Sequence, residues 1–429
     1  MTTYAALTKR VRSAIDARFD DSLNFLQELV RQRSTLGNEL GVQQLVLARM
    51  RQLGLSAESW DLDLELLRRH PAFGPLELDY RRRPNVTARW AAAQPGGRSL
   101  ILNGHVDVVG EGARSAWSRD PWEPRIEGDW MYGRGAADMK SGVAAMLLAV
   151  ESLRAAQCEL RGDVILESVI EEECTGNGTL ACALRGLRAD AALLPECTGL
   201  TASRANVGVF WFRVRVLGRA GHAQATVAGV NAIEKMVFVF TALRALEAEL
   251  NAEADHPLYS GQPHPLNLNI GVIRGGDWPS SVPADCTVEC RLACLPGSTV
   301  EQAQSRVRAA IAKAAAADAW LRECPPEVEF FGFRAAPSVV DTDAAAMQLL
   351  AECHTELNGS PLEFTADTAT SDQRFFLNEL AMPATCYGPL GENIHAADER
   401  VWIPSIRQTA QVLALYMMRW CGVADAAGA

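Results

Sequence analysis

The spacing of apolar and polar positions changes several times along the chain. Residues 4–53 carry apolar side chains at helical spacing, with a break near residues 34–37 and an end at Gly54, which predicts two helices. From about residue 85, short runs of strand-forming residues alternate with helical stretches. These runs are NVTARW, SLILNGHVDVV, GDVILESVI and ADAALLPE. Strands that alternate with helices predict a largely parallel sheet with helices on both faces.

A different order of elements is predicted for residues 207–336. The run VGVFWFRVRVLG alternates like a half-exposed strand, and a long helix follows at about 230–250. Two strand-like runs, a second helix at 301–318 and the strand EVEFFGF complete the block. The order β-α-β-β-α-β is that of the ferredoxin-like split unit. We therefore predict an α/β fold in which a three-layer domain, formed by residues 1–206 and 337–429, is interrupted by an α+β ferredoxin-like domain.

Composition and charge exclude several classes of protein. The 429 residues are 48% hydrophobic, an ordinary globular composition, and the net charge of −11 disfavours binding to nucleic acid. The short run Arg81–Arg83 does not change this, and we expect it to lie solvated at an edge or turn. No apolar run reaches the roughly 18 residues needed to cross a bilayer, and the N-terminus lacks a signal-peptide core. Eleven scattered cysteines without a C-x-x-C pair fit a reducing compartment. We expect a cytoplasmic protein that binds neither nucleic acid nor membrane.

Acidic residues and histidines follow the predicted strands at their carboxyl ends. In open α/β sheets, ligands bind outside this edge. Any one of these side chains alone would more often be a surface, core or capping residue, but their shared position at one edge indicates a site. The glycine-rich turn YGRGAADMKSG adds an aspartate just before a helix. The candidates are His105, Asp107, Asp138, the run Glu171–Glu173, Glu196 and His395.

The types of donor favour a metal centre. Imidazole and carboxylate ligands suit Zn²⁺, Mn²⁺ or Co²⁺, and three adjacent glutamates after a buried strand would repel each other unless a cation neutralised them. Two histidines and three carboxylates are enough for two ions that share one bridging carboxylate. Two ions roughly 3.5–4 Å apart can hold a hydroxide and polarise an acyl oxygen, while a further carboxylate accepts the proton of the water. Asp107 can hydrogen-bond the other ring nitrogen of His105 and fix its tautomer.

Together these segments resemble the dinuclear zinc hydrolases that include acetylornithine deacetylase, succinyl-diaminopimelate desuccinylase, aminoacylase and glutamate carboxypeptidase. The resemblance covers essentially the whole chain. The stretch RHPAFGPLELDYRRRPNV resembles an insert of the acetylornithine deacetylase-like branch. The matching segments are RQRSTLGNE, NGHVDVV, YGRGAADMKSG, EEE, LPECT, GRAGHAQATVAGVNAI and GENIHAADERV.

The resemblance implies a ligand set for two divalent metal ions, Zn²⁺ first and Co²⁺ or Mn²⁺ as alternatives. It assigns His105 and Glu196 to one ion, and Glu173 and His395 to the other. Asp138 bridges the two ions.

The resemblance also implies roles for residues that do not bind metal. Asp107 orients His105, and Glu172 is the general base. The peptide bond between Asp138 and Met139 is expected to be cis. The family triplet usually begins with Asp, whereas this one begins with Glu171, so a register shifted by one residue stays open.

For residues 207–336 the resemblance implies a lid that also forms a homodimer, while 1–206 and 337–429 form the catalytic domain. His222 would reach the active site of the partner subunit and stabilise the oxyanion. Arg291 matches an arginine that grips a substrate carboxylate, and Asn269 is a second expected substrate contact. Ser280 stands where the family often has Asn, which weakens one contact. From the residues alone, an exposed His222 and an exposed strand Arg291 are the alternatives.

The expected function is a metal-dependent amidohydrolase that removes an N-acyl group from a small amino acid or amine. A metal-bridging hydroxide attacks the amide, and Glu172 carries the proton to the leaving amine. Hydrolysis of another C–N bond is the alternative: an N-formyl aminopyrimidine, a dipeptide or an aromatic amine. A non-catalytic binding protein is disfavoured because no ligand or base is lost. A nucleotide-binding protein is disfavoured because GRGAADMKSG matches neither G-x-G-x-x-G nor a P-loop.

Overall fold

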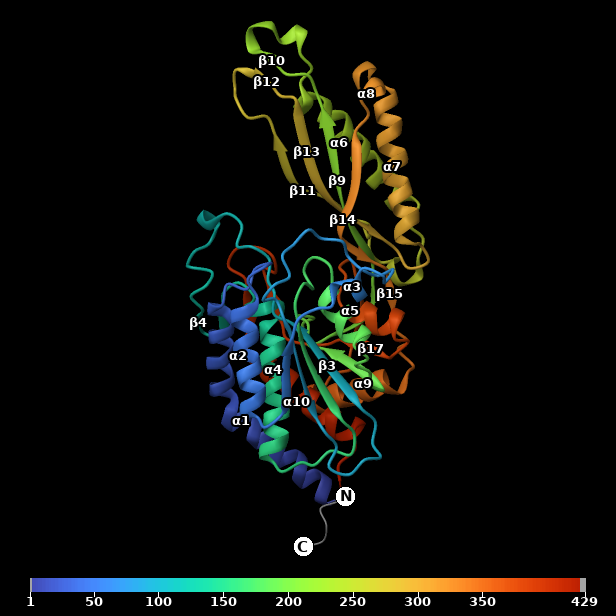
Figure 1. The fold of residues 1–429 in the computed structure, drawn as a ribbon. Helices are drawn as coiled ribbons and strands as arrows, with labels where there is room; N and C mark the ends of the chain where they lie inside the picture. Colours follow the sequence, from blue (N-terminus) through green and yellow to red (C-terminus); the bar gives the residue numbers. More distant parts are fainter. Residues whose placement is uncertain (1, 425–429) are drawn as a thin grey trace.

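The computed structural model describes residues 2–424, which form a larger lower lobe and an elongated upper lobe (Figure 1). The lower lobe is built around a six-stranded sheet of order β1-β2-β6-β3-β7-β17. Strands β6, β3, β7 and β17 pair in parallel, whereas β2 is antiparallel to both of its neighbours. The predicted α/β fold with a mostly parallel sheet is therefore confirmed. The strands are β1 (Ser56–Trp60), β2 (Asn85–Trp90), β3 (Leu100–His105), β6 (Val164–Val169), β7 (Ala191–Leu194) and β17 (Ala384–Cys386).

Helices cover both faces of this sheet. Successive residues of β3 point to opposite sides, so Leu100 and Leu102 join the core under helices α4 and α10, while Ile101 packs with Phe376 on the other side. Helix α4 is apolar nearly all round because it lies between the sheet and two other helices, α1 and α10. The helices are α1 (Thr2–Arg31), α2 (Leu40–Gln52), α3 (Leu64–Leu67), α4 (Ser141–Ala155), α5 (Asn177–Leu184), α9 (Ala345–Asn358) and α10 (Ile403–Trp420).

Two small sheets hold loops near the carboxyl end of the large sheet. One has the order β18-β19-β5-β4 and the other the order β15-β8-β16. The first positions the turns before α4 and before β19, and the second contributes one wall of a cavity described below. Their strands are β4 (Arg125–Glu127), β5 (Trp130–Tyr132), β8 (Ala202–Asn206), β15 (Ser338–Val339), β16 (Phe364–Asp367), β18 (Gly391–Glu392) and β19 (Arg400–Trp402).

The upper lobe contains the antiparallel sheet β11-β13-β9-β14 with α6 and α7 on one face (Figure 1). Its element order is the predicted β-α-β-β-α-β, and its strands lie between Gly208 and Ala335. Alternate residues of β9, such as Phe210 and Phe212, are buried under the helices. The elements are β9 (Gly208–Leu217), β10 (Gly221–His222), α6 (Ala232–Ala252), β11 (Leu268–Gly275), β12 (Ser281–Val282), β13 (Asp285–Cys294), α7 (Val300–Ala316), α8 (Ala319–Glu323) and β14 (Glu327–Ala335).

The prediction that the run Arg81–Arg83 is solvated is wrong for its last residue. Arg81 is exposed and pairs with Asp79, but the Arg83 side chain is only 1% exposed. Its guanidinium lies 2.6 Å from a Glu39 oxygen and 2.5 Å from a Glu171 oxygen. A buried guanidinium is tolerated here because two fixed carboxylates satisfy its planar set of donors.

Within residues 2–424, the structure contains no helix that is both long and apolar enough to cross a membrane. All eleven cysteines are unpaired.

Candidate active site

Five segments bring the predicted metal ligands together at the carboxyl edge of the large sheet. His105 ends β3, Glu173 follows β6 and Glu196 follows β7, while Asp138 lies in a turn before α4 and His395 in the loop between β18 and β19. One ligand atom each from His105, Asp138 and Glu173 lies within 4.8 Å of the others. The convergence follows from parallel strands ending at the same edge.

Asp138 lies between the two histidines. Its Oδ1 is 3.2 Å from His105 Nε2, and its Oδ2 is 3.5 Å from His395 Nε2. Glu196 Oε1 lies 3.8 Å from the same His105 nitrogen, and Glu173 Oε2 lies 3.0 Å from the His395 nitrogen. Each carboxylate oxygen of Asp138 therefore faces a separate histidine–glutamate pair.

The turn that carries Asp138 is held by Glu399, a residue that the sequence did not single out. The Glu399 carboxylate accepts hydrogen bonds from the backbone nitrogens of Gly135, Ala137 and Asp138, at 2.9–3.1 Å, and from Arg134. Gly135 has φ +78°, and a side chain there would also meet Val108. Glu399 lies in the segment GENIHAADERV, but only its neighbours in space reveal its role. The Asp138–Met139 peptide bond is cis, as the resemblance implied.

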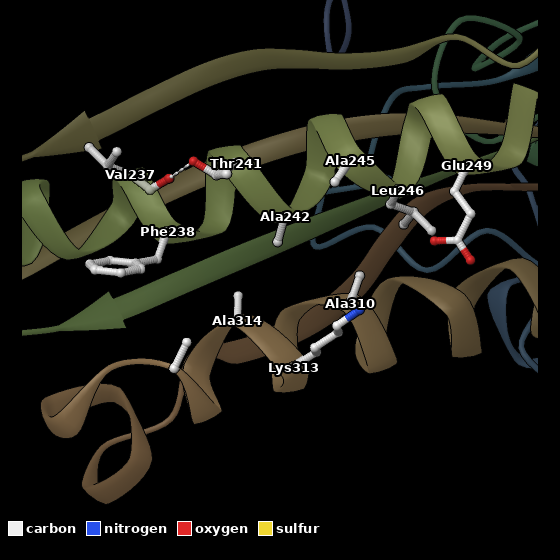
Figure 2. Close-up of a pocket in the computed structure, with 11 residues that line it drawn as sticks. Val237, Phe238, Thr241, Ala242, Ala245, Leu246, Glu249, Ala310, Lys313 and Ala314 are labelled. Carbon is white, nitrogen blue, oxygen red and sulfur yellow. Dashed lines mark hydrogen bonds between the residues drawn. The ribbon is translucent and has the colours of Figure 1, made fainter.

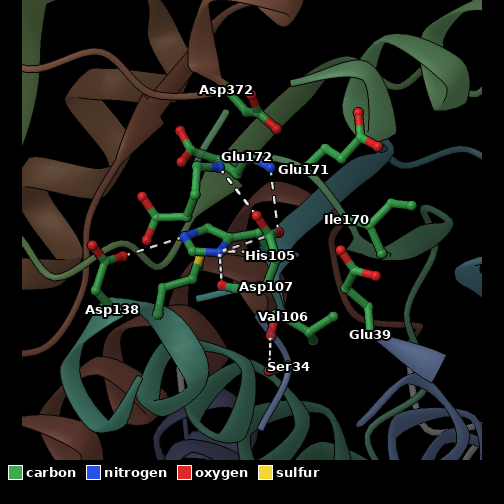
Figure 3. A network of polar contacts seen from close by, with 12 residues as sticks. Ser34, Glu39, His105, Val106, Asp107, Asp138, Ile170, Glu171, Glu172 and Asp372 are labelled. Carbon is green, nitrogen blue, oxygen red and sulfur yellow. Dashed lines mark hydrogen bonds and ion pairs between the residues drawn. The ribbon is translucent and has the colours of Figure 1, made fainter. Parts of the chain in front are cut away.

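Asp107 contacts His105 in a different way from the one expected. His105 Nδ1 lies 2.9 Å from the main-chain oxygen of Asp107 and 3.6 Å from its carboxylate (Figure 3). The carboxylate instead accepts hydrogen bonds from the backbone nitrogens of Glu172 and Glu173, at 3.3 and 3.1 Å. The orienting hydrogen bond thus comes from the backbone because the turn after β6 occupies the side chain.

The three adjacent glutamates have separate surroundings. Glu171 has φ +68°, and its carboxylate is bound by Arg83, Tyr80 Oη at 2.9 Å and Thr175 Oγ1 at 2.8 Å. Glu172 and Glu173 line the cavity beside Asp138. Glu171 is thus occupied by a buried ion pair, and its two successors face the site.

The electrostatics of the cluster fit bound cations. Burial raises the pKa of Glu196 to about 8 and that of Asp107 to about 7. Burial and the nearby Asp372 raise the pKa of Glu172 well above its ordinary value. Burial alone would lower the pKa of His395, but its hydrogen bonds to Asp138 and Glu173 raise it to about 11. Imidazole nitrogens and carboxylate oxygens a few ångströms apart are a suitable donor set for divalent ions. Bound cations would also offset the repulsion between the buried carboxylates.

A cavity of about 420 Å³ adjoins the cluster. Four of the five ligand candidates line it, and its other walls carry several polar side chains and come mainly from β8, β16 and the loop that follows β16. The sequence analysis did not identify these wall residues, because nothing in their spacing distinguishes them from other loop residues. They include Ser203, Asn206, Asp367, Thr368, Thr370 and Ser371.

The three upper-lobe candidates do not join the cluster within this chain. His222 is exposed near the far tip of the upper lobe, where its Nδ1 accepts a hydrogen bond from the backbone nitrogen of Gln224 (Figure 1). Arg291 is half-buried on β13 and donates a hydrogen bond of 3.1 Å to the main-chain oxygen of Thr368, which lines the cavity. Asn269 is exposed and lies opposite Arg291 in the strand register.

Known proteins resemble this chain in sequence and in fold. The model of peptidase family M20/M25/M40 matches residues 101–419. The N-formyl-4-amino-5-aminomethyl-2-methylpyrimidine deformylase of Halalkalibacterium halodurans is 29% identical over 405 residues, 90% of each chain. The succinyl-diaminopimelate desuccinylase of Leptothrix cholodnii is 30% identical over 402 residues, 90% of this chain and 95% of the relative. The di-peptidase Dug1p of Saccharomyces cerevisiae shares the fold, with a TM-score of 0.78 at 15% identity over 96% of this chain and 98% of that one. The chain therefore belongs to peptidase family M20/M25/M40.

Proposed function

We propose that the protein is a metal-dependent amidohydrolase that removes an N-acyl group from a small amino acid or amine. The observation that carries this proposal is Asp138, whose two oxygens face two histidine–glutamate pairs. Two relatives that span most of the chain are named for the removal of a formyl and of a succinyl group, which supports this class of substrate. A hydrolase of another C–N bond is the alternative on the same scaffold.

The ligand set that we propose holds two divalent ions, with zinc first and cobalt or manganese as alternatives. His105 and Glu196 bind one ion, Glu173 and His395 bind the other, and Asp138 bridges them. When bound, such ions lower the pKa of water and polarise an acyl oxygen. One donor atom each from His105, Asp138 and Glu173 already lies within 4.8 Å of the other two, which supports ion binding among them.

Glu172 is the proposed general base. Its side chain lines the cavity next to Glu173, and within residues 2–424 no side chain donates a hydrogen bond to its carboxylate. With cations bound beside it, which would favour its ionised form, Glu172 could take a proton from the attacking water and pass it to the nitrogen of the leaving amine. Asp107 positions a metal ligand and the general base, since its main-chain oxygen contacts His105 and its carboxylate accepts a hydrogen bond from the backbone nitrogen of Glu172.

Two conservative variants separate base from ligand. Glu172→Gln should bind metal normally and lose roughly 10²–10⁴-fold or more in kcat, because it cannot accept the proton. Glu173→Gln should instead lower metal content. A panel of N-acetyl, N-formyl, N-succinyl and dipeptide substrates, assayed with Zn²⁺, Co²⁺ and Mn²⁺ and with metal content measured by mass spectrometry, tests both. The reverse pattern would show that base and ligand are shifted by one residue within Glu171–Glu173. If none of the N-acyl substrates is hydrolysed, the proposed function is wrong.

We also propose that residues 207–336 act as a lid and as the contact surface of a homodimer. Helix α6 exposes Ile233, Val237 and Phe238, which is unusual for a fully solvated helix. Val237 and Phe238 line a groove between α6 and α7, together with small alanines (Figure 2). Strand β11 is at the edge of its sheet and has one side free for pairing.

The unpaired cysteines support a reducing cytoplasm as the place of action.

A further inference from the structure

One wall of the cavity carries polar groups that the proposed mechanism does not use. It forms where β8 and β16 end side by side, because the two strands pair in parallel with Asn206 opposite Asp367. Parallel pairing brings both carboxyl ends to the same edge, so these two side chains line the cavity together. They share this cavity with Glu172 and Glu173, so a substrate bound at the metal cluster lies against them.

Asp367 has no cationic partner among residues 2–424. The side-chain partner of its carboxylate is the hydroxyl of Ser203, and no arginine, lysine or histidine influences its pKa, which burial raises to about 6. At neutral pH it is therefore mostly ionised. Arg291, the one upper-lobe arginine that reaches this loop through a hydrogen bond, donates to the main-chain oxygen of Thr368 instead. A partly buried, unpaired carboxylate is costly unless something cationic or strongly donating binds to it.

The residues beside Asp367 complete a polar wall. Asn206 Oδ1 accepts a hydrogen bond of 2.9 Å from Ser371, which leaves its amide nitrogen as a donor. Thr370 Oγ1 is buried and has no hydrogen-bond partner within the described residues. Buried polar atoms are normally satisfied, so an unpartnered hydroxyl beside an unpaired carboxylate indicates that a ligand supplies the missing contacts. The wall offers a charged acceptor flanked by weaker polar groups.

We propose that Asp367 sets substrate specificity by accepting a hydrogen bond from a second nitrogen in the amine part of the substrate. This nitrogen is either an ammonium group or an amino group beside a ring nitrogen. An ammonium group offers rotatable donors, whereas a protonated amino heterocycle offers two parallel N–H groups that match both carboxylate oxygens. The inference rests on the proposed amidohydrolase function and names the class of its substrate.

Matched substrates test this inference with the metal-loaded enzyme. The N-acyl derivatives of a diamine and of an aminomethyl-aminopyrimidine are compared with analogues in which the second nitrogen is replaced by carbon. The enzyme should prefer the nitrogen-bearing substrate in kcat/KM by roughly 10- to 100-fold, as expected for a hydrogen bond to a charged group. Asp367→Asn should remove most of this preference, because it should lower kcat/KM far more on the nitrogen-bearing substrates than on the carbon analogues. The control is Glu363→Gln, an exposed change beside the same strand, which should keep the preference.

The outcomes separate this inference from the proposed function. The better of the two nitrogen-bearing substrates identifies the donor. Equal rates on matched substrates, or an equal loss on both in Asp367→Asn, would overturn the specificity role while hydrolysis still supports the function. If no N-acyl substrate is hydrolysed, the binding of the free amines is measured by calorimetry. Binding that needs both the second nitrogen and Asp367 supports the specificity role of Asp367. Binding that needs neither, or no binding at all, overturns that role. Should the Asn variant be unstable in thermal unfolding, Asp367→Ser replaces it.

Discussion

At the scale of single residues, the surroundings decide what each of three adjacent glutamates can do. Glu171 turns away from the cavity and neutralises Arg83, while Glu172 and Glu173 face the cavity. The backbone nitrogens of Glu172 and Glu173 donate hydrogen bonds to the Asp107 carboxylate, which fixes the backbone that carries these two side chains. Identical side chains therefore serve different purposes because their hydrogen-bond partners differ.

The sequence could predict the metal-ligand candidates but not their supports. His105, Glu173 and Glu196 follow buried strands, and the geometry of a parallel sheet brings such positions together. Arg83 could not be predicted to be buried, because its partners Glu39 and Glu171 are 44 and 88 residues away in the chain. Charge runs alone carry no information about such distant contacts.

Removal of the Arg83 guanidinium should destabilise the protein strongly. Arg83→Met leaves Glu39 and Glu171 buried without a counter-charge, and breaking a buried pair in this way costs about 3–5 kcal/mol. Urea unfolding followed by circular dichroism measures the loss. Arg81→Met is the matched control, since Arg81 is exposed and should change stability by less than about 0.5 kcal/mol. Equal stability of the two variants would show that the buried network contributes little.

At the scale of elements, the start of α4 is where two ligand segments meet. Gly142 lies in the first turn of this helix, one turn after Asp138, and a side chain there would come within 1.8 Å of the Pro195 oxygen. Pro195 directly precedes Glu196, so the glycine allows the end of β7 to approach the Asp138 turn. The ligand geometry therefore depends on the close packing of α4 against the end of β7.

Gly142→Ala should therefore disrupt both packing and metal binding. Helix propensity alone predicts a gain of up to about 1 kcal/mol from this change, whereas overpacking against a backbone oxygen costs about 1–3 kcal/mol or more. We expect the second effect to dominate, with lower thermal stability and lower metal content. Gly261→Ala is the control, because a side chain there meets nothing within 4 Å. A Gly142 variant that is more stable and keeps its full metal content would show that the close approach of α4 to the end of β7 is not needed.

The long elements could be predicted and the short ones could not. The upper-lobe strands β9 and β13 are ten residues each and alternate clearly between buried and more exposed positions. Strands such as β15, β18 and β19 are two or three residues long, too short to show any period. Strand β16, which carries Asp367, has four half-buried residues and thus no alternation. The cavity wall that carries Asp367 is built from such segments, so its residues could be identified only from the structure.

At the scale of the whole molecule, His222, the expected oxyanion residue, lies far from the candidate metal ligands. His222 is exposed near the tip of the upper lobe, and the cluster lies in the lower lobe (Figure 1). A single chain in this arrangement leaves the site without His222. If the upper lobes form the proposed dimer, each His222 can serve the site of the other subunit. The active unit would then be the dimer, and lid closure would complete each site.

Mixing two inactive variants tests whether His222 acts across the dimer. We expect His222→Ala and Glu172→Gln each to be inactive as homodimers, because one would lack the proposed oxyanion donor and the other the proposed base. After subunit exchange, a mixed dimer has one site with an intact Glu172 and an intact His222 from the partner. It should regain about half of the wild-type activity, or about a quarter for a random one-to-one mixture.

The matched control for this mixture uses two lesions that belong to the same part of the site. Asp138→Ala mixed with Glu172→Gln leaves every site with one defect, since both residues lie in the cluster of their own chain. That mixture should stay inactive whether or not the subunits exchange. If the His222→Ala mixture also stays inactive after exchange has been confirmed by mass spectrometry, His222 does not act across the dimer. Activity in the first mixture alone requires that His222 of one chain reach the cluster of the other, which no arrangement within one subunit can produce.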